Sequence, residues 1–172
     1  MNLPALELDP KDAVPAVIGA VRDYWASKCR GARLPSREQI RPAEIKAWLP
    51  HILLVDVLEG GADFRYRVVG TRIMQDFTTS PTGRRMSDVI APFGAPAVNE
   101  TLRVYRGVVE GRAPLQMRGS GAWYAQGAKT FDAVLAPLSD DGERVNMIFG
   151  AFVFVFEEKR DPALQGSLLA AR

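Results

Sequence analysis

The residue types that carry most enzymatic and metal chemistry are scarce in this sequence. It contains one histidine, His51, and one cysteine, Cys29, among 172 residues. Nucleophilic catalysis needs a nucleophile, a base and a group that orients the base, and a closed zinc site needs several Cys or His ligands. The carboxylates Asp56, Asp76 and Asp88 could serve in acid–base chemistry, but no spacing brings two of them together. We therefore expect no catalytic residue, no metal site and no enzymatic activity.

The remaining polar motifs do not predict a dedicated ligand either. The sequence has no G-x-x-x-x-G-K-[ST] loop and no G-x-G-x-x-G pattern, which removes support for nucleotide hydrolysis and dinucleotide binding. Asp140, Asp141 and Glu143 form an acidic stretch that reads more readily as a solvated hairpin turn than as a calcium site. What remains is binding in a pocket lined by ordinary side chains.

Arg67 is the most informative charged residue because it lies in a strand-like run among apolar residues. A charge near the core requires a partner. In one interpretation Arg67 lies on the outer face of the sheet, paired with an acid such as Asp132 or Glu143 or covered by the N-terminal helix. In the other, its guanidinium receives a ligand carboxylate through two hydrogen bonds. The sequence leaves both open.

Bulk composition limits the class of protein. Hydrophobic residues make up 47% and charged residues 24%, as in ordinary globular domains, and the net charge is only +2. A nucleic-acid-binding domain usually has a stronger basic excess. A lone cysteine suits a reducing compartment, the N-terminus lacks a signal-peptide pattern, and no apolar run is long enough to span a membrane. We expect a cytoplasmic protein that binds neither nucleic acid nor membranes.

An amphipathic helix is predicted near the start of the chain, from Asp12 to about Arg30. Asp12 is a candidate N-cap, and Gly31 is a candidate left-handed residue at the C-terminus. Apolar residues recur at spacings of three and four and form one stripe, made of Val14, Val17, Ile18, Val21, Trp25 and Cys29. The stripe must be buried, either against its own domain or against a second copy in a homodimer.

A five-stranded antiparallel sheet is predicted for the rest of the chain. A short helix over 43–49, opened by Pro42 and closed by Pro50, leads into it, and a longer helix is predicted over 96–110. The strands are predicted over 51–58, 64–70, 114–124, 129–138 and 144–156. The first and last strands are apolar on both faces, so they should be neighbours at the centre. Two hairpins then flank them, which gives an α+β fold with the strand order 2-1-5-4-3.

This order, together with five local segments, resembles the PAS domain. The segments are RLPSREQIRP, LLVDVLEGG, FRYRVVGT, TGRRMSDV and APLSDDGERV, in that order along the chain. They are similar to those of a bacterial PAS subfamily of small stand-alone proteins, over about Tyr24 to Phe156. The resemblance divides the chain into an N-terminal helix and linker (1–50), a PAS core (51–156) and a polar tail (157–172). It implies a sensory or protein-interaction module that acts in signal transduction through an output protein.

The resemblance also implies a pocket between the sheet and the mid-chain helices. The residues expected there are Tyr66, Arg67, Thr71, Ile73, Met74, Phe77, Met86, Leu102, Tyr105, Phe131, Met147 and Phe149. They either fill a core or form the wall of a ligand site. The cofactor is unknown. His51 is misplaced as a haem ligand, although Met74 or Met86 could ligate in principle, and Cys29 is misplaced for a flavin–cysteine adduct.

Three functions follow from these observations. The first is an adaptor that binds a small molecule and signals to a partner. The second is a dimerisation module without a ligand. The third is a small enzyme on an α+β cavity fold, because a fold does not determine function.

Overall fold

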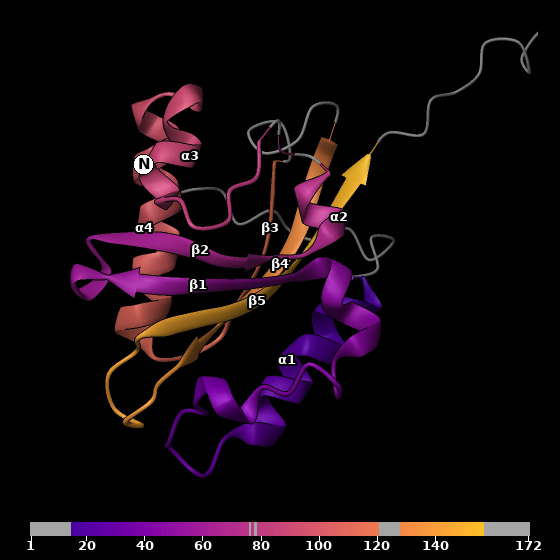
Figure 1. The fold of residues 1–172 in the computed structure, drawn as a ribbon, viewed down its shortest axis with the longest axis vertical. Helices are drawn as coiled ribbons and strands as arrows, with labels where there is room; N and C mark the ends of the chain where they lie inside the picture. Colours follow the sequence, from indigo (N-terminus) through magenta and orange to yellow (C-terminus); the bar gives the residue numbers. More distant parts are fainter. Residues whose placement is uncertain (1–14, 76, 78, 121–127, 157–172) are drawn as a thin grey trace, which may run out of the picture.

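The computed structural model describes residues 15–75, 77, 79–120 and 128–156 (Figure 1). Its elements in chain order are α1 (Ala16–Lys28), η1 (Arg37–Gln39), η2 (Lys46–His51), β1 (Ile52–Leu58), η3 (Glu59–Gly61), β2 (Asp63–Val69), α2 (Thr71–Met74), α3 (Met86–Ile90), η4 (Ala91–Phe93), α4 (Ala95–Gly111), β3 (Leu115–Ser120), β4 (Ala128–Leu138) and β5 (Met147–Phe156). The elements written η are short 3-10 helices. No helix in the described part of the chain is long and apolar enough to cross a membrane.

The strands form one antiparallel sheet in the order β2-β1-β5-β4-β3, which confirms the predicted fold. β1 lies between β2 and β5, so that Leu53 is opposite Val69 on one side and Gly150 on the other. Gly150 has no room for a side chain, because a Cβ there would lie 2.4 Å from the carbonyl oxygen of Val134. The two strands that are apolar on both faces, β1 and β5, are neighbours among the three inner strands, as their burial requires.

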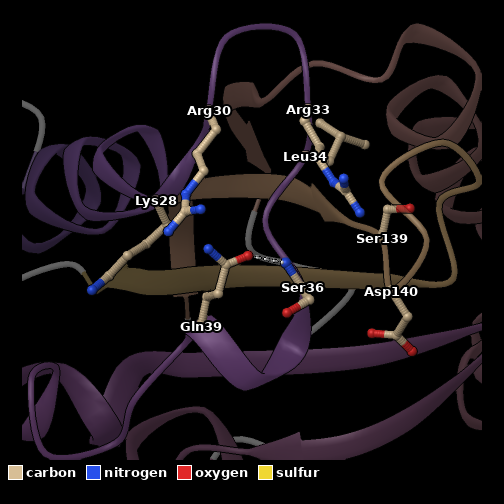
Figure 2. Close-up of a pocket in the computed structure, with 8 residues that line it drawn as sticks. All are labelled: Lys28, Arg30, Arg33, Leu34, Ser36, Gln39, Ser139 and Asp140. Carbon is tan, nitrogen blue, oxygen red and sulfur yellow. Dashed lines mark hydrogen bonds between the residues drawn. The ribbon is translucent and has the colours of Figure 1, made fainter.

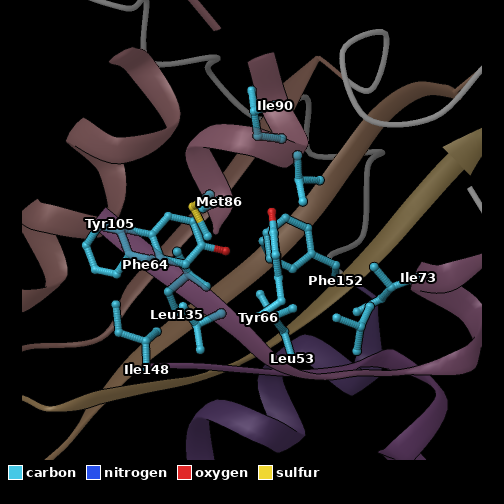
Figure 3. Close-up of a cluster of buried hydrophobic side chains, with 14 of the residues drawn as sticks. Leu53, Phe64, Tyr66, Ile73, Met86, Ile90, Tyr105, Leu135, Ile148 and Phe152 are labelled. Atoms are coloured by element: carbon cyan, nitrogen blue, oxygen red, sulfur yellow. The ribbon is translucent and has the colours of Figure 1, made fainter. Parts of the chain in front are cut away.

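Each face of the sheet carries its own hydrophobic cluster. α2, α3 and α4 cover one face, with Phe64, Tyr66, Met86 and Ile148 among the buried residues (Figure 3). α1 and residues 34–48 cover the other face (Figure 1). The alternation of side chains along each strand supplies both clusters from the same strands.

The apolar stripe of α1 packs against the chain's own sheet. Ile18 and Val21 are fully buried, and the indole Nε1 of the buried Trp25 donates a hydrogen bond of 2.8 Å to the carbonyl oxygen of Pro137. Val17 is partly buried in the same cluster. Of the two interpretations of the stripe, the structure supports packing within one chain. The predicted start of this helix at Asp12 was wrong, because α1 begins at Ala16 with Pro15 as its N-cap. Asp12 and Val14 themselves lie outside the described residues.

Other predicted boundaries were wrong for local reasons. α1 ends at Lys28, and Gly31 (φ +60°) instead belongs to a turn that brings Arg30 and Arg33 together. Pro50 lies inside η2 rather than after a helix, because this short 3-10 segment passes directly into β1. β5 begins at Met147, three residues later than predicted, because the preceding residues belong to the turn after β4.

Candidate functional site

A cavity of about 370 Å³ lies between the sheet and α4. Its walls come from β1, β2, β3, β4, β5 and the helical segments on that face. Most of the lining is apolar or aromatic, and it consists of Leu53, Tyr66, Ile73, Phe77, Ile90, Ala97, Glu100, Thr101, Val104, Tyr105, Met117, Arg118, Gly119, Ser120, Phe131, Phe152 and Phe154. Figure 3 shows Tyr66 and Phe152 side by side, rising from the sheet toward Ile90 on α3. Cavities of this size and character are typical of small-molecule sites.

Aromatic rings form one wall of the cavity. Phe131 lies 5.5 Å from Phe152 and 6.3 Å from Phe154, measured between ring centroids. Gly119 on β3, opposite Phe131 in the register, allows this arrangement, because a Cβ there would come within 2.6 Å of the Phe131 ring. The wall is thus built by a glycine on an edge strand and alternate residues of two inner strands.

Most of the lining surface is apolar, and its polar residues are Tyr66, Glu100, Thr101, Tyr105, Arg118 and Ser120. Thr101 and Tyr105 contribute from the buried face of α4, and Tyr66 contributes from β2, where its ring meets Phe77 edge-on at 6.4 Å. A cavity of this kind favours an apolar or aromatic ligand that needs only one or two hydrogen bonds.

The structure places five of the predicted pocket residues in the cavity lining: Tyr66, Ile73, Phe77, Tyr105 and Phe131. Met74, Met86 and Leu102 belong to the adjoining hydrophobic cluster and do not line the cavity. Thr71 is exposed at the start of α2. Met74, Met86 and Leu102 therefore pack behind the cavity, whereas Thr71 belongs neither to the cluster nor to the lining.

Two predicted pocket residues on β5, Met147 and Phe149, lie on the wrong face. Both are buried in the cluster under α1. Phe152 and Phe154 take the cavity side instead, because side chains alternate along a strand. The sequence of β5 is apolar at almost every position, so it contained no alternation that could have assigned the faces.

Arg67 does not enter the cavity. Its side chain is exposed, and Nε donates a hydrogen bond of 2.7 Å to the Asp56 carboxylate, which also receives one of 3.4 Å from Arg65. The proposed carboxylate-binding role of Arg67 is therefore wrong. The outer-face interpretation was right about the side chain's position, although its partner is Asp56 rather than Asp132 or Glu143.

A buried acidic residue that the sequence analysis did not single out, Asp63, holds the N-terminal end of α3 in place. The Asp63 carboxylate accepts hydrogen bonds from the Ser87 hydroxyl (2.7 Å), the Ser87 N–H (3.3 Å) and the Phe64 N–H (2.7 Å), and it contacts Arg85. Burial raises the pKa of Asp63, but these hydrogen bonds outweigh it and hold the pKa below its ordinary value. This network ties α3 to the start of β2, beside the cavity.

Neither His51 nor Cys29, the residues considered as cofactor ligands, lines the cavity. His51 is half-buried at the end of η2, with Nδ1 3.2 Å from the carbonyl oxygen of Phe152. Cys29 follows α1 on the other side of the sheet, where burial raises the pKa of its thiol. The described residues contain no group of three or more His, Cys, Asp or Glu side chains that could hold a metal ion.

One family model matches most of the chain. A family model described as PAS domain matches residues 15–153. No curated protein matches the chain. Among solved structures, the PAS domain of Bordetella pertussis BvgS is similar at 16% identity and a TM-score of 0.51, over 76% of this chain and 94% of that one.

Two further solved structures are similar at lower TM-scores. An RNA-binding light-oxygen-voltage receptor matches at 18% identity and a TM-score of 0.44, over 80% of this chain and 40% of that one. The RsLOV d2 variant matches at 13% identity and a TM-score of 0.43, over 74% of each chain. At such identities the similarity concerns the fold alone.

Proposed function

The chain belongs to the PAS domain family, a family of sensory and interaction modules, and we propose that it senses a small apolar or aromatic molecule in the cavity beside α4. The cavity itself is the observation that carries this proposal. Its volume of about 370 Å³ matches a compact molecule of one or two rings, and its lining offers aromatic faces with a few hydroxyl groups.

The affinity for such a ligand would come mainly from apolar burial. Each Å² of apolar surface removed from water contributes about 25 cal/mol, so an aromatic ligand needs little polar recognition to bind. Leu53, Phe131 and Phe152 supply this surface from three adjacent strands, and Tyr66 and Tyr105 supply hydroxyl groups at its border.

A signal would leave the domain through the sheet and α1. Phe152 faces the cavity, while its neighbour Ala151 and the nearby Phe149 pack under α1. If the ligand binds with different affinity to two states of the domain that differ in the position of β5, its binding would therefore shift the position of α1 on the sheet. The exposed side of α1, which carries Arg22, Asp23 and Ala26, is the surface that we propose an output protein reads.

The predicted homodimer remains a prediction, and it needs a different surface from the one first assigned. Ile18, Val21 and Trp25 are already covered by the chain's own sheet. A dimer that used them would have to expose the cluster that they now close. A substitution at Val21 would accordingly test folding rather than assembly.

Two measurements test the ligand proposal. Native and denaturing mass spectrometry of the purified chain should differ by the mass of a co-purified ligand. Indole, as a probe of the ligand class, should raise the melting temperature of the ligand-free chain in a saturable way. Val104→Phe, which fills the cavity from α4, should abolish both effects, whereas Asn99→Phe on the exposed side of the same helix should keep them.

The opposite result favours the dimerisation module without a ligand. If Val104→Phe stabilises the chain and no bound mass or indole effect appears in the parent protein, the cavity is a packing space and not a ligand site. The search for function would then move to protein partners.

A further inference from the structure

A second, open cleft lies on the side of the sheet that α1 covers. Its volume is about 470 Å³, and it is lined by Lys28, Arg30, Arg33, Leu34, Ser36, Gln39, Ser139 and Asp140 (Figure 2). It is formed by the end of α1, the turn that follows it, η1 and the turn between β4 and β5. It shares no lining residue with the cavity beside α4.

A tight turn places two arginines side by side above this cleft. The N–H of Arg30 donates to the carbonyl oxygen of Arg33 (3.3 Å), and the N–H of Arg33 donates to that of Arg30 (3.1 Å). Residues that exchange both hydrogen bonds in an antiparallel pair project their side chains to the same face. Gly31, at φ +60°, lets the chain reverse between them. Figure 2 shows both side chains directed from this turn into the cleft, Arg30 toward Gln39 and Arg33 toward Ser139.

The position of Arg33 is fixed by the neighbouring hairpin turn. Its Nη2 donates to the carbonyl oxygen of Asp141 (3.4 Å), and its side chain lies over Gly142 so closely that a Cβ there would be 2.5 Å from Nε. The guanidinium of Arg30 has no hydrogen-bond or ion-pair partner among the residues that the structure describes. One cation is therefore held in place and the other is available.

The neutral groups in the cleft are mostly donors. The Gln39 side-chain oxygen accepts the N–H of Ser36 (2.8 Å), which leaves the amide NH₂ of Gln39 for the cleft. The Ser36 hydroxyl lies at the floor of the cleft, where its O–H can donate as well.

The carboxylates nearby are already engaged. Asp141 accepts from the Ser139 hydroxyl and the N–H groups of Glu143 and Arg144, each at 2.8 Å. Asp140 accepts from the side-chain amide of Asn146 at 2.7 Å but keeps its negative charge, and Lys28 is paired with Glu44, so the two arginines outnumber the one carboxylate in the lining. The cleft therefore presents the guanidinium groups of Arg30 and Arg33 and the neutral donors Ser36 and Gln39, and few acceptors in its lining can receive their hydrogen bonds.

From this arrangement we propose that the cleft binds the phosphate or diphosphate group of a small molecule. Guanidinium groups match phosphate oxygens with paired, charge-assisted hydrogen bonds, and two of them balance a dianion. Arg30 and Arg33 hold the phosphate, Gln39 and Ser36 donate to its remaining oxygens, and the open side of the cleft accommodates the rest of the molecule. The site is independent of the cavity beside α4, so either proposal can fail without the other.

The test is a titration of the full chain with inorganic pyrophosphate, followed by amide chemical shifts in ¹H–¹⁵N spectra. We expect saturable shifts at residues 30–39 and 139–142, and binding that weakens as salt is added. Arg30→Gln should weaken binding at least tenfold, as the loss of a charge-assisted hydrogen bond pair implies. The pyrophosphate affinity of Arg30→Lys should lie between those of the parent protein and Arg30→Gln, because lysine keeps the charge and loses the paired hydrogen-bond geometry.

Arg72→Gln is the matched control, since it removes one exposed arginine on α2, outside the cleft. It should leave pyrophosphate binding unchanged. Arg33→Gln also removes the contact with Asp141, so its spectrum must first show the native fold, and Arg30→Gln carries the test if it does not. Equal losses for Arg30→Gln and Arg72→Gln, or shifts that never saturate, would overturn the proposal. Comparison of pyrophosphate with ADP then separates recognition of the phosphate alone from recognition of a nucleotide.

Discussion

The ion pair between Arg118 and Asp132 offers a sharp test of how the cavity wall is held. Arg118 on β3 and Asp132 on β4 are directly opposite in the register, and two hydrogen bonds of 2.9 Å join the guanidinium to both carboxylate oxygens. Their side chains are only 11% and 4% exposed. They lie one position along the strands from Gly119 and Phe131, which face the cavity, and Arg118 also borders it.

The expected cost follows from the burial of this pair. Removing one partner of a buried ion pair leaves the other charge in a poor environment and costs about 3–5 kcal/mol. In a domain of this size, such a loss lowers the melting temperature by roughly 6–20 °C. We therefore expect Asp132→Leu and Arg118→Met each to destabilise the chain by this amount.

The double variant should behave very differently. Replacing a buried pair by apolar residues of similar volume is often neutral, because the desolvation penalty of both charges disappears. Arg118→Met combined with Asp132→Leu should return the free energy of unfolding to within about 1 kcal/mol of the parent. Urea unfolding, followed by circular dichroism, measures all four corners of this cycle.

The exposed pair Glu100–Arg103 on α4 serves as the control, because its side chains are 40% and 63% exposed. Arg103→Met should change stability little, since solvent screens such a pair. The reasoning is refuted if Asp132→Leu costs no more than Arg103→Met, or if the double variant is as unstable as the sum of the single ones.

Two further predictions concern glycines and pH. Gly107 lies in open space within α4, so Gly107→Ala should stabilise the chain by about 0.5–1 kcal/mol. Gly70→Ala should destabilise it by more than about 1 kcal/mol, because the new Cβ would lie 2.3 Å from the carbonyl oxygen of Pro50. Thermal unfolding of both variants compares these effects. Backbone hydrogen bonds from Glu143 and Arg144 lower the pKa of Asp141 to about 2, so its contribution should be complete above about pH 4 and be lost as the pH falls toward 2. Asp141→Ala should make the urea midpoint less dependent on pH between about pH 2 and pH 4. If the midpoint of the variant changes with pH as steeply as that of the parent protein, this assignment is contradicted.

The strand order could be predicted because its signals are local. β1 and β5, two of the three inner strands, are apolar on both faces, and the turns at 59–61 and 139–142 specify hairpins. Burial and turn chemistry therefore sufficed without any knowledge of distant contacts. The same holds for the stripe of α1, whose spacing predicted a buried face, although spacing alone cannot say which molecule covers it.

The candidate site could be predicted only in part, because strand faces need alternation to be assigned. In β2, charged residues alternate with Phe64 and Tyr66, so the exposed position of Arg67 was available from the sequence. In β5, the run MIFGAFVFVF contains no polar residue to mark the outside, and Met147 and Phe149 were therefore assigned to the wrong face. The role of Gly119 depends on its opposite residue across β3 and β4, which only the register reveals.

The lack of alternation in β5 is also what would make this strand useful for signalling. A strand with large side chains on both faces couples two tightly packed clusters, and such packing transmits a displacement rather than absorbing it. If a ligand beside Phe152 favours one position of β5, it also favours the position of α1 on the sheet that goes with it. Because coupling between two sites is reciprocal, a protein that holds α1 in that seat must raise the ligand affinity of the cavity by the same factor. The partner and the ligand would then report on each other through one strand.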